Sequence, residues 1–201
     1  NTIFNKKVIG LNVTRPYKKS IIPYLDVLDV IAQKTQSVNT IYINPKTKKK
    51  IGYNTDFIGF EKLFSCFCKN VKQALILGSG GASNTISHFL NTKHIDYKIV
   101  SRKPEYNMIQ YKEINSIIAD VSLIINTTPL GQYPKINHYP DLPYDSISKQ
   151  HVCIDLIYNP QQTMFLTKSQ LKGAKIINGE KMLFAQAEAS FAIWKQMTSL
   201  I

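Results

Sequence analysis

Leu75-Ile-Leu-Gly78-Ser-Gly80-Gly81-Ala-Ser-Asn-Thr-Ile86 is the stretch that decides the fold of this chain. It combines the end of an apolar strand predicted over Lys72–Leu77, a tight glycine turn and a helix predicted over Asn84–Thr92. Glycines remove the Cβ atoms that would block a pyrophosphate, and the helix start offers free N–H groups. The spacing is G-x-G-G without a third glycine, so an ordinary strand–turn–helix corner remains an alternative.

The next predicted strand, Tyr97–Val100, adds information about the nucleotide. It ends at Ser101-Arg102-Lys103, about twenty residues after Gly78. An NAD site usually has Asp or Glu at this place to bind the ribose 2′-hydroxyl. A hydroxyl and two cations suit a 2′-phosphate instead, because Arg makes paired, charge-assisted bonds to phosphate. The residues therefore favour NADP over NAD.

Strand and helix patterns alternate along the chain, which predicts an α/β fold with a doubly wound parallel sheet. After Val100 we expect helices over Tyr111–Ile118, Thr163–Lys172 and Lys181–Met197. Between them we expect strands over Ser122–Asn126, Val152–Ile157 and Lys175–Ile177, with a long loop over Thr127–Tyr144. Before Lys72 we expect a strand, a helix, a hairpin and a helix, over Val8–Val13, Lys19–Lys34, Thr40–Ile43 with Ile51–Tyr53, and Asp56–Phe67.

Two strand ends near the N-terminus carry a cation and a carboxylate. In Gly10–Lys18, Pro16 ends the strand and Lys18 follows it, while the segment Gly52–Asp56 ends in Asp56. Strand ends are where α/β proteins place their chemistry, and a Lys with an Asp is an acid–base layout. Taken alone, each residue also has an ordinary interpretation, as a surface Lys and as a helix N-cap.

Composition limits the function classes. The net charge of +12 permits nucleic-acid binding, but the cations are scattered, apart from Lys46–Lys50, which we interpret as a solvated hairpin tip. Cys66, Cys68 and Cys153 form no CxxC pair, which fits a reducing cytoplasm and predicts no metal site. No apolar run reaches the roughly 18 residues of a membrane span, and no secretion leader is visible.

The order of motifs resembles that of the shikimate dehydrogenase family over nearly all of the chain. The matching segments are Asn12-Val-Thr14-x-Pro16-x-Lys18, Asn39-Thr40, Asn54-Thr-Asp56, Gly78–Ala82, Ser101-Arg102, Ile125-Asn-Thr-Thr-Pro-Leu-Gly131, Asp155-Leu-Ile-Tyr-Asn-Pro160, Asn178-Gly-x-x-Met-Leu183 and Gln186-Ala-x-x-x-Phe191. The resemblance implies reversible NADPH-dependent reduction of 3-dehydroshikimate to shikimate, in the biosynthesis of chorismate and aromatic amino acids. It also implies a Rossmann-type NADP domain, residues 57–178, and a smaller α/β substrate domain, residues 1–56 with 179–201, completed by the C-terminal helix.

The resemblance also implies roles for individual residues. Lys18 and Asp56 match the catalytic pair, in which the Lys exchanges a proton with the carbonyl oxygen and the Asp orients it. Substrate-binding positions are matched by Thr14, Asn39, Tyr158 and Gln186. NADP-binding positions are matched by Gly78, Gly80, Gly81, Ala82, Ser101 and Arg102, and positions near the nicotinamide by Leu156, Gly179 and Met182. By residue type alone, an ordinary role for Gln186, as an exposed side chain or one with its hydrogen bonds made within the protein, is as good an interpretation as substrate binding.

Two departures from the family keep alternatives open. The family begins with a further strand and helix that carry an S-x-S motif for the substrate carboxylate, so we expect this chain to be a piece whose upstream part is absent. Its NADP strand end usually reads Asn-Arg-Thr, where this chain has Ser101-Arg102-Lys103. The alternatives are an NAD-using quinate/shikimate dehydrogenase, an inactive fragment that only binds nucleotide, and a noncatalytic nucleic-acid-binding protein. We expect a small-molecule substrate, no nucleic-acid or membrane partner, and a monomer or homodimer.

Overall fold

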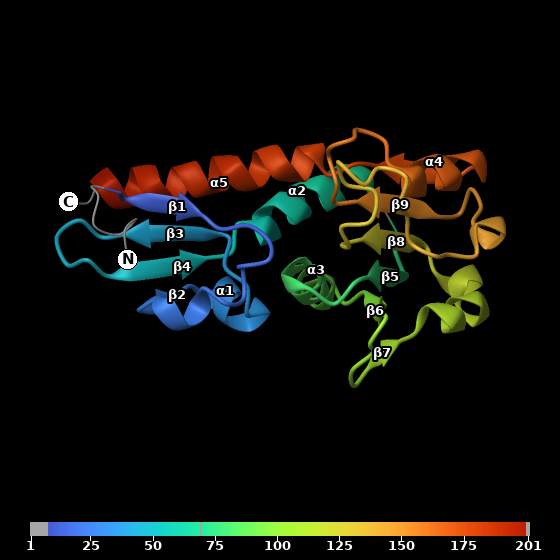
Figure 1. Cartoon of the computed structure of the whole chain (residues 1–201), viewed down its shortest axis with the longest axis horizontal. Helices are drawn as coiled ribbons and strands as arrows, with labels where there is room; N and C mark the ends of the chain where they lie inside the picture. Colours follow the sequence, from blue (N-terminus) through green and yellow to red (C-terminus); the bar gives the residue numbers. More distant parts are fainter. Residues whose placement is uncertain (1–7, 69, 200–201) are drawn as a thin grey trace.

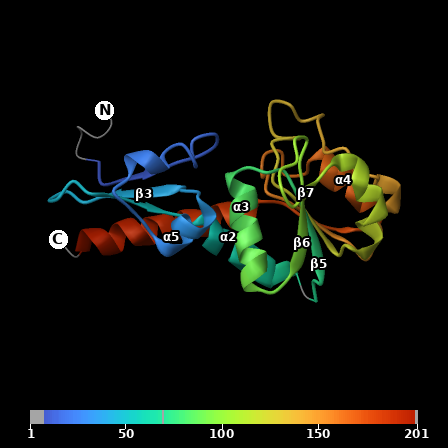
Figure 2. The same ribbon diagram turned by 90° about the horizontal axis from the view of Figure 1, so that it is seen from below.

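The structure of the chain, a computed structural model, describes residues 8–68 and 70–199, which form two β-sheets joined by helices (Figure 1). Seen from below, the smaller sheet and the larger sheet lie at opposite ends of the molecule, with α2 (Asp56–Phe67) and α3 (Gly81–Thr92) between them (Figure 2). Of the described helices, none is long and apolar enough to cross a membrane.

The larger sheet has six strands in the order β10-β9-β8-β5-β6-β7. Their bounds are Gln73–Leu77 for β5, Asp96–Val100 for β6, Met108–Ile109 for β7, Leu123–Asn126 for β8, Val152–Asp155 for β9 and Lys175–Ile177 for β10. All neighbouring strands are parallel, which confirms the predicted doubly wound sheet. The chain reverses its direction of travel across the sheet between β5 and β8, and such a switch point is where α/β sheets bind ligands.

The alternation of side chains along β5 explains why its sequence is apolar at every position. Ala74 and Ile76 face a core that contains residues of α2 and α3, among them Phe60 and Phe89. Leu75 and Leu77 face the opposite core, which contains Ile114 and Phe165. Helices cover both faces of the sheet, because η2 (Tyr111–Ser116) and α4 (Met164–Leu171) contribute to this second core.

The smaller sheet has four strands in the order β1-β3-β4-β2, with bounds Gly10–Asn12, Thr40–Ile43, Lys50–Tyr53 and Val27–Leu28 respectively. β3 is antiparallel to β1 and β4, which confirms the predicted hairpin, and β2 is parallel to β4. The last helix, α5 (Glu180–Ser199), runs from the larger sheet across the smaller one (Figure 1). Its Trp194 donates to the carbonyl of Ile41 on β3 at 2.9 Å.

The prediction of a helix over Lys19–Lys34 is wrong. The segment forms a 3₁₀ turn at Ile22–Tyr24, the strand β2, and a short helix, α1 (Val30–Thr35). Pro23 cannot donate a helical hydrogen bond, and Asp29 starts a new helix because its carboxylate accepts from the Ala32 N–H at 2.8 Å. The apolar residues reach the core of the smaller sheet without helical spacing.

Smaller differences concern element type and ends. Tyr111–Ile118 forms 3₁₀ turns, η2 and η3 (Ile118–Asp120), instead of an α-helix, and the two-residue strand β7 was not expected. The helix after the glycine turn begins at Gly81 rather than at Asn84, so the last glycine of the turn is already helical. The remaining predicted strands and helices agree with the structure within a few residues at each end.

Candidate active site

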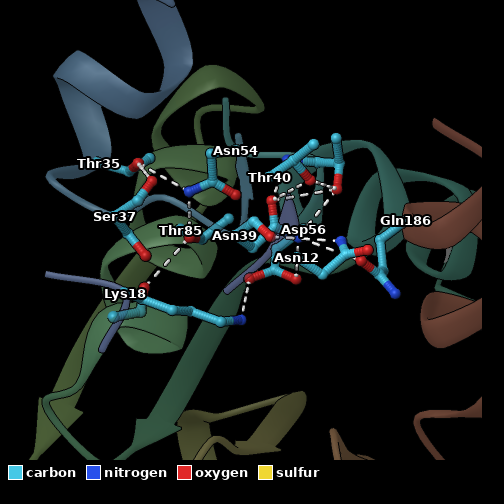
Figure 3. A network of polar contacts seen from close by, with 12 residues as sticks. Asn12, Lys18, Thr35, Ser37, Asn39, Thr40, Asn54, Asp56, Thr85 and Gln186 are labelled. Atoms are coloured by element: carbon cyan, nitrogen blue, oxygen red, sulfur yellow. Dashed lines mark hydrogen bonds and ion pairs between the residues drawn. The ribbon is translucent and has the colours of Figure 1, made fainter. Parts of the chain in front are cut away.

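Lys18 and Asp56, the cation and the carboxylate that follow two separate strands, form an ion pair. Lys18 lies in the turn that follows β1, and Asp56 is the first residue of α2, where the positive end of the helix dipole favours a carboxylate. The Lys18 Nζ to Asp56 Oδ2 distance is 2.5 Å (Figure 3). The Lys18 side chain is 20% exposed and that of Asp56 is 7% exposed, so the cation faces solvent more than its partner does.

Asn39 brings Gln186 to this ion pair. Asn39 is 3% exposed, and its Nδ2 lies 3.0 Å from Asp56 Oδ1 and 3.2 Å from Gln186 Oε1. The Gln186 amide nitrogen donates to the carbonyl of Leu183 in its own helix at 2.9 Å. Four predicted site residues, three from the N-terminal segment and one from α5, therefore share one network, although Asn39 and Gln186 are 147 positions apart.

Three hydroxyls to which the sequence analysis gave no role support this network. Ser190 Oγ lies 2.7 Å from Thr40 Oγ1 and 3.0 Å from Thr55 Oγ1, and it donates to the carbonyl of Gln186 at 2.9 Å. Ser190 is one helical turn after Gln186, so helical spacing was the signal that could have identified it. The hydroxyls hold α5 against β3, and they thereby fix the position of Gln186.

Thr14 and Tyr158 are not part of this network. Both side chains are exposed, Tyr158 by 45%, and within the described residues neither makes a hydrogen bond to Lys18, Asp56, Asn39 or Gln186. Thr14 precedes the turn that carries Lys18, and Tyr158 follows β9. Their exposure leaves both hydroxyls accessible to a ligand.

The glycine turn leaves room for a ligand at one glycine only. Gly78 has φ +104°, a conformation that favours glycine, and a Cβ on it would lie 2.9 Å from Thr127 Oγ1. A Cβ on Gly81 would lie 2.9 Å from Ser37 Oγ, so this glycine permits close packing between two parts of the chain. A Cβ on Gly80 would meet no atom within 4 Å.

The open space at Gly80 adjoins the N-terminus of α3. Gly80 is the N-cap residue of α3 and provides no side chain to bind the first N–H groups of this helix. These N–H groups and the positive end of the helix dipole form an anion site, and Ala82 is half-buried in the same first turn. The turn therefore fits a pyrophosphate.

The register of the sheet brings the other predicted cofactor residues to the same edge. Leu77 pairs with Val100 and with Asn126, so the glycine turn, Ser101 and the loop after β8 follow adjacent strand ends. Ser101 is 7% exposed, and its Oγ lies 3.2 Å from Ser79 Oγ of the glycine turn. Arg102 is exposed beside it. A buried hydroxyl and an exposed cation beside the turn fit the 2′-phosphate of NADP.

Leu156, Gly179 and Met182 lie together where β9 ends and α5 begins. A Cβ on Gly179 would collide with the backbone carbonyl of Leu156, and the Gly179 N–H donates to Ile157 O at 3.1 Å. Met182 is 8% exposed and belongs to the core against which Leu156 packs. Close packing of the backbone therefore accounts for Gly179 without reference to a cofactor.

A further contact joins the loops on either side of the network. Arg15 lies between Thr14 and Lys18, and its Nη2 donates to Gln132 Oε1 at 2.5 Å. Gln132 follows the Thr-Thr-Pro-Leu-Gly segment after β8. The loop that carries Lys18 thus touches the loop at the switch point of the larger sheet.

Asp155 is a buried carboxylate at the end of β9 that the sequence analysis did not consider as a site residue. It is fully buried and accepts from Thr163 Oγ1 at 2.6 Å, from the Ile157 N–H at 3.0 Å and from Asn126 Nδ2 at 3.1 Å. Burial raises the pKa of Asp155 to about 6, although the hydrogen bonds from Thr163, Ile157 and Asn126 oppose this rise. Asp155 and Asn126 shape the loops that follow β9 and β8.

We expect Asp155 to give the stability a pH dependence that Asp155→Asn removes. Its folded-state pKa of about 6 lies above its ordinary value of 3.8, so its contribution is fully present below about pH 3.8 and is lost as the pH rises through 6. The difference in free energy of unfolding between the wild type and Asp155→Asn, wild type minus variant, should fall by about 2 kcal/mol between pH 4 and pH 7. Urea denaturation at these pH values measures it.

The exposed Asp120 provides the control, because Asp120→Asn should leave the pH profile of the wild type unchanged. Parallel profiles for the wild type and Asp155→Asn would show that Asp155 titrates equally in the folded and unfolded states.

Comparisons with known proteins agree with this architecture. The family model described as "Shikimate dehydrogenase substrate binding domain" matches residues 1–41. The shikimate dehydrogenase (NADP(+)) of Methanosphaera stadtmanae is 40% identical, over 94% of this chain and 73% of that protein. The shikimate dehydrogenase (NADP(+)) of Clostridium beijerinckii is 37% identical, over 94% of this chain and 73% of its own length.

Solved structures extend the similarity to three dimensions. Shikimate dehydrogenase 1 of Peptoclostridium difficile superimposes with a TM-score of 0.87 and 35% identity, over 97% of this chain and 74% of that one. A shikimate dehydrogenase crystallised with NADP+ has a TM-score of 0.78 and 36% identity, over 93% of this chain and 71% of its own. Since the relatives from Methanosphaera stadtmanae and Clostridium beijerinckii are 40% and 37% identical over 94% of the chain and 73% of their own length, the chain belongs to the shikimate dehydrogenase family.

Proposed function

We propose that this chain catalyses the reversible NADPH-dependent reduction of 3-dehydroshikimate to shikimate, a step in the biosynthesis of chorismate and aromatic amino acids. One observation carries the proposal: Lys18 lies where the two ligand sites meet. Its Nζ pairs with Asp56, and a Cβ on Gly81 of the glycine turn would lie 3.5 Å from Lys18 Cβ. The cation is thus next to both a cofactor-type turn and a group of amides suited to a polyhydroxylated substrate.

The residues at the edge of the larger sheet would hold NADPH, which supplies the hydride when bound. Its pyrophosphate would be held by Gly78, Gly80, Gly81, Ala82 and the first turn of α3, and its 2′-phosphate by Ser101 and Arg102. Leu156, Gly179 and Met182 would lie near its nicotinamide. The open space at Gly80 supports this assignment, since a side chain there would occupy it.

Lys18 acts as the general acid in reduction. Its ammonium group donates a proton to the carbonyl oxygen of 3-dehydroshikimate, and in the reverse direction the amine takes the proton from the shikimate hydroxyl. Asp56 holds the ammonium group in place through the 2.5 Å contact and accepts from a neighbouring substrate hydroxyl. Asn39 keeps Asp56 oriented, because its Nδ2 lies 3.0 Å from the second carboxylate oxygen.

Substrate hydroxyls are bound by amide and hydroxyl groups from separate elements. Asn39 Nδ2 carries two hydrogens but lies within hydrogen-bond distance of three acceptors, on Thr55, Asp56 and Gln186. The Gln186 oxygen can therefore leave Asn39 for a substrate hydroxyl without leaving the Asn39 amide unsatisfied. Thr14 and Tyr158 add exposed hydroxyls from the two flanking loops.

We assign residues 1–56 with 179–201 to the substrate domain and residues 57–178 to the NADP domain. Support comes from the two sheets, because the four-stranded sheet with most of α5 lies apart from the six-stranded sheet (Figure 2). Residues 1–7, 69, 200 and 201 of this assignment lie outside the described residues. The three cysteines are unpaired, which suits a reducing compartment, and we propose a cytoplasmic enzyme acting as a monomer or homodimer.

The experiment that tests the function is shikimate-dependent reduction of NADP+, followed by absorbance, with NAD+ and quinate in parallel. Turnover with shikimate and NADP+ that exceeds the other combinations supports the proposal. Faster turnover with NAD+ and quinate would assign the chain to the quinate branch. Absence of turnover in a chain that binds NADPH would mean that it retains only nucleotide binding.

We expect Arg102→Leu to weaken binding of NADPH by about 10- to 100-fold and to change binding of NADH by less than about twofold. The guanidinium makes charge-assisted hydrogen bonds to the 2′-phosphate, which NADH lacks. Titration of protein fluorescence with each nucleotide measures the two dissociation constants. Lys98→Met, which removes an exposed cation from β6, is the charge-matched control. Equal losses for the two nucleotides would remove the 2′-phosphate assignment.

A further inference from the structure

Asn54 connects the two parts of the molecule from a position two residues before Asp56. It is 3% exposed, and its Nδ2 donates to Thr35 Oγ1 at 2.8 Å and to Thr85 Oγ1 at 2.9 Å (Figure 3). Thr35 is the last residue of α1, beside the smaller sheet, whereas Thr85 lies in the first turns of α3, after the glycine turn. One side chain therefore bridges the two helices.

The two hydroxyls continue the bridge to backbone carbonyls. Thr85 Oγ1 donates to Gly81 O at 3.2 Å, and Thr35 Oγ1 donates to Ile31 O at 2.8 Å. Each hydroxyl has one hydrogen, which it donates to a carbonyl, so both hydroxyls act as acceptors toward Asn54. The direction of every hydrogen bond in this bridge is therefore fixed. The bridge ends at the carbonyl of Gly81, a residue of the proposed pyrophosphate site.

Two neighbouring contacts hold the same helices together. Asn84 Nδ2 donates to the carbonyl of Thr35 at 3.0 Å, and Gly81 lies so close to Ser37 that a Cβ on it would be 2.9 Å from Ser37 Oγ. The end of α1 and the segment after it thus contact the first turn of α3 through one further hydrogen bond and through close packing at Gly81.

The segment from Asn54 to Asp56 is itself fixed in place. The Thr55 N–H donates to Asn39 Oδ1 at 2.8 Å, and Asp56 pairs with Lys18. The three consecutive residues therefore bind, in order, the cofactor-side helix, the amide of Asn39 and the proton donor. A shift of α3 relative to Asn54 would move the glycine turn relative to Lys18.

The carbonyl oxygen of the Asn54 side chain is a feature that selection for stability alone would not favour. This atom, Oδ1, is buried, and in the described part of the chain it has no hydrogen-bond partner. A buried carbonyl oxygen without a partner lowers stability, and such features are found at positions with a functional task. The side chain is placed for its two donor contacts.

We propose that Asn54 is a positioning residue that sets the distance between the pyrophosphate-binding turn and the Lys18–Asp56 pair. This inference rests on the proposed function, because it assigns the turn to NADPH and the pair to proton transfer. Displacements of about 1 Å at a reacting centre lower rates by up to about 10²-fold, so a buried link between the two sites has a direct effect on turnover.

Thr85→Val tests the link, because it removes the acceptor of Asn54 while it keeps the size of the side chain. We expect kcat to fall by about tenfold, with KM for shikimate changed by about fivefold or less. Asn54→Ala should give a similar loss, and the double variant should lose no more than either single variant, since all three break the same link. Ser87→Ala is the matched control: it removes another buried hydroxyl of α3, one with no partner among the described residues, and should keep the kcat of the wild type.

A binding measurement separates positioning from stability and from the proposed reaction. NADPH and shikimate do not react with each other, so calorimetry can give the Kd for NADPH with and without saturating shikimate. We expect a ratio of about five or more between the two values in the wild type and a ratio near one in Thr85→Val. Absence of turnover in the wild type would contradict the proposed function but leave this ratio measurable. Equal ratios in the two proteins, or a lower Tm with unchanged kcat in Thr85→Val and Asn54→Ala, would overturn the positioning role.

Discussion

Lys18→Met is expected to lower kcat for shikimate oxidation by between about 10²- and 10⁴-fold, while binding of NADPH changes by less than about threefold. Methionine keeps most of the length of the side chain but can neither donate nor accept the proton. The glycine turn and Arg102 remain, so the proposed cofactor site is intact. Steady-state kinetics with NADP+ and fluorescence titration with NADPH measure the two effects.

Loss of the cation also leaves Asp56 without its ionic partner, so this variant needs two controls. Lys19→Met removes the adjacent, exposed cation and should retain the kcat of the wild type. Circular dichroism should show that Lys18→Met is folded at the assay temperature, since Asn39 still donates to Asp56. Retention of more than about a tenth of the wild-type kcat would exclude Lys18 as the general acid.

Gly179→Ala is expected to lower the free energy of unfolding by about 3 kcal/mol. The added Cβ would collide with the carbonyl of Leu156, which is backbone and cannot move aside as a flexible side chain can. The collision lies at the junction of β9 and α5, so relief requires the helix that carries Gln186 to shift. Urea denaturation gives the change in stability, and KM for shikimate should rise with it.

Gly80→Ala is the matched comparison, and it should weaken binding of NADPH without lowering the free energy of unfolding. Its Cβ meets no protein atom within 4 Å, and φ is −89°, which alanine adopts without strain. We expect the free energy of unfolding to remain the same or to rise by up to about 1 kcal/mol. Binding of NADPH should weaken by about tenfold, since the methyl group occupies the proposed pyrophosphate site. If Gly80→Ala bound NADPH as tightly as the wild type, the pyrophosphate would lie elsewhere.

The larger sheet could be predicted because its strands are buried on both faces. Runs such as Leu75–Leu77 and Leu123–Ile125 are apolar at every position, and each is followed by a residue typical of turns, Gly78 or Asn126. The helix predicted over Lys19–Lys34 failed because the period of its apolar residues fitted a helix, whereas Pro23 and the Asp29 cap divided the segment. Periodicity over a short segment does not show where a chain turns.

The sequence by itself determined the alternation of strands and helices, the glycine turn, the basic strand end and the strand-end positions of Lys18 and Asp56, because each follows from a local pattern of residues. Only the tertiary structure decided that Gln186 meets Asn39, that Ser190 supports both and that Asn54 binds Thr85. These contacts join α5 and α3 to residues that directly precede β3 or follow β4 of the smaller sheet. Their geometry depends on how helices pack, and a local sequence pattern carries no information about distances between residues far apart in the chain.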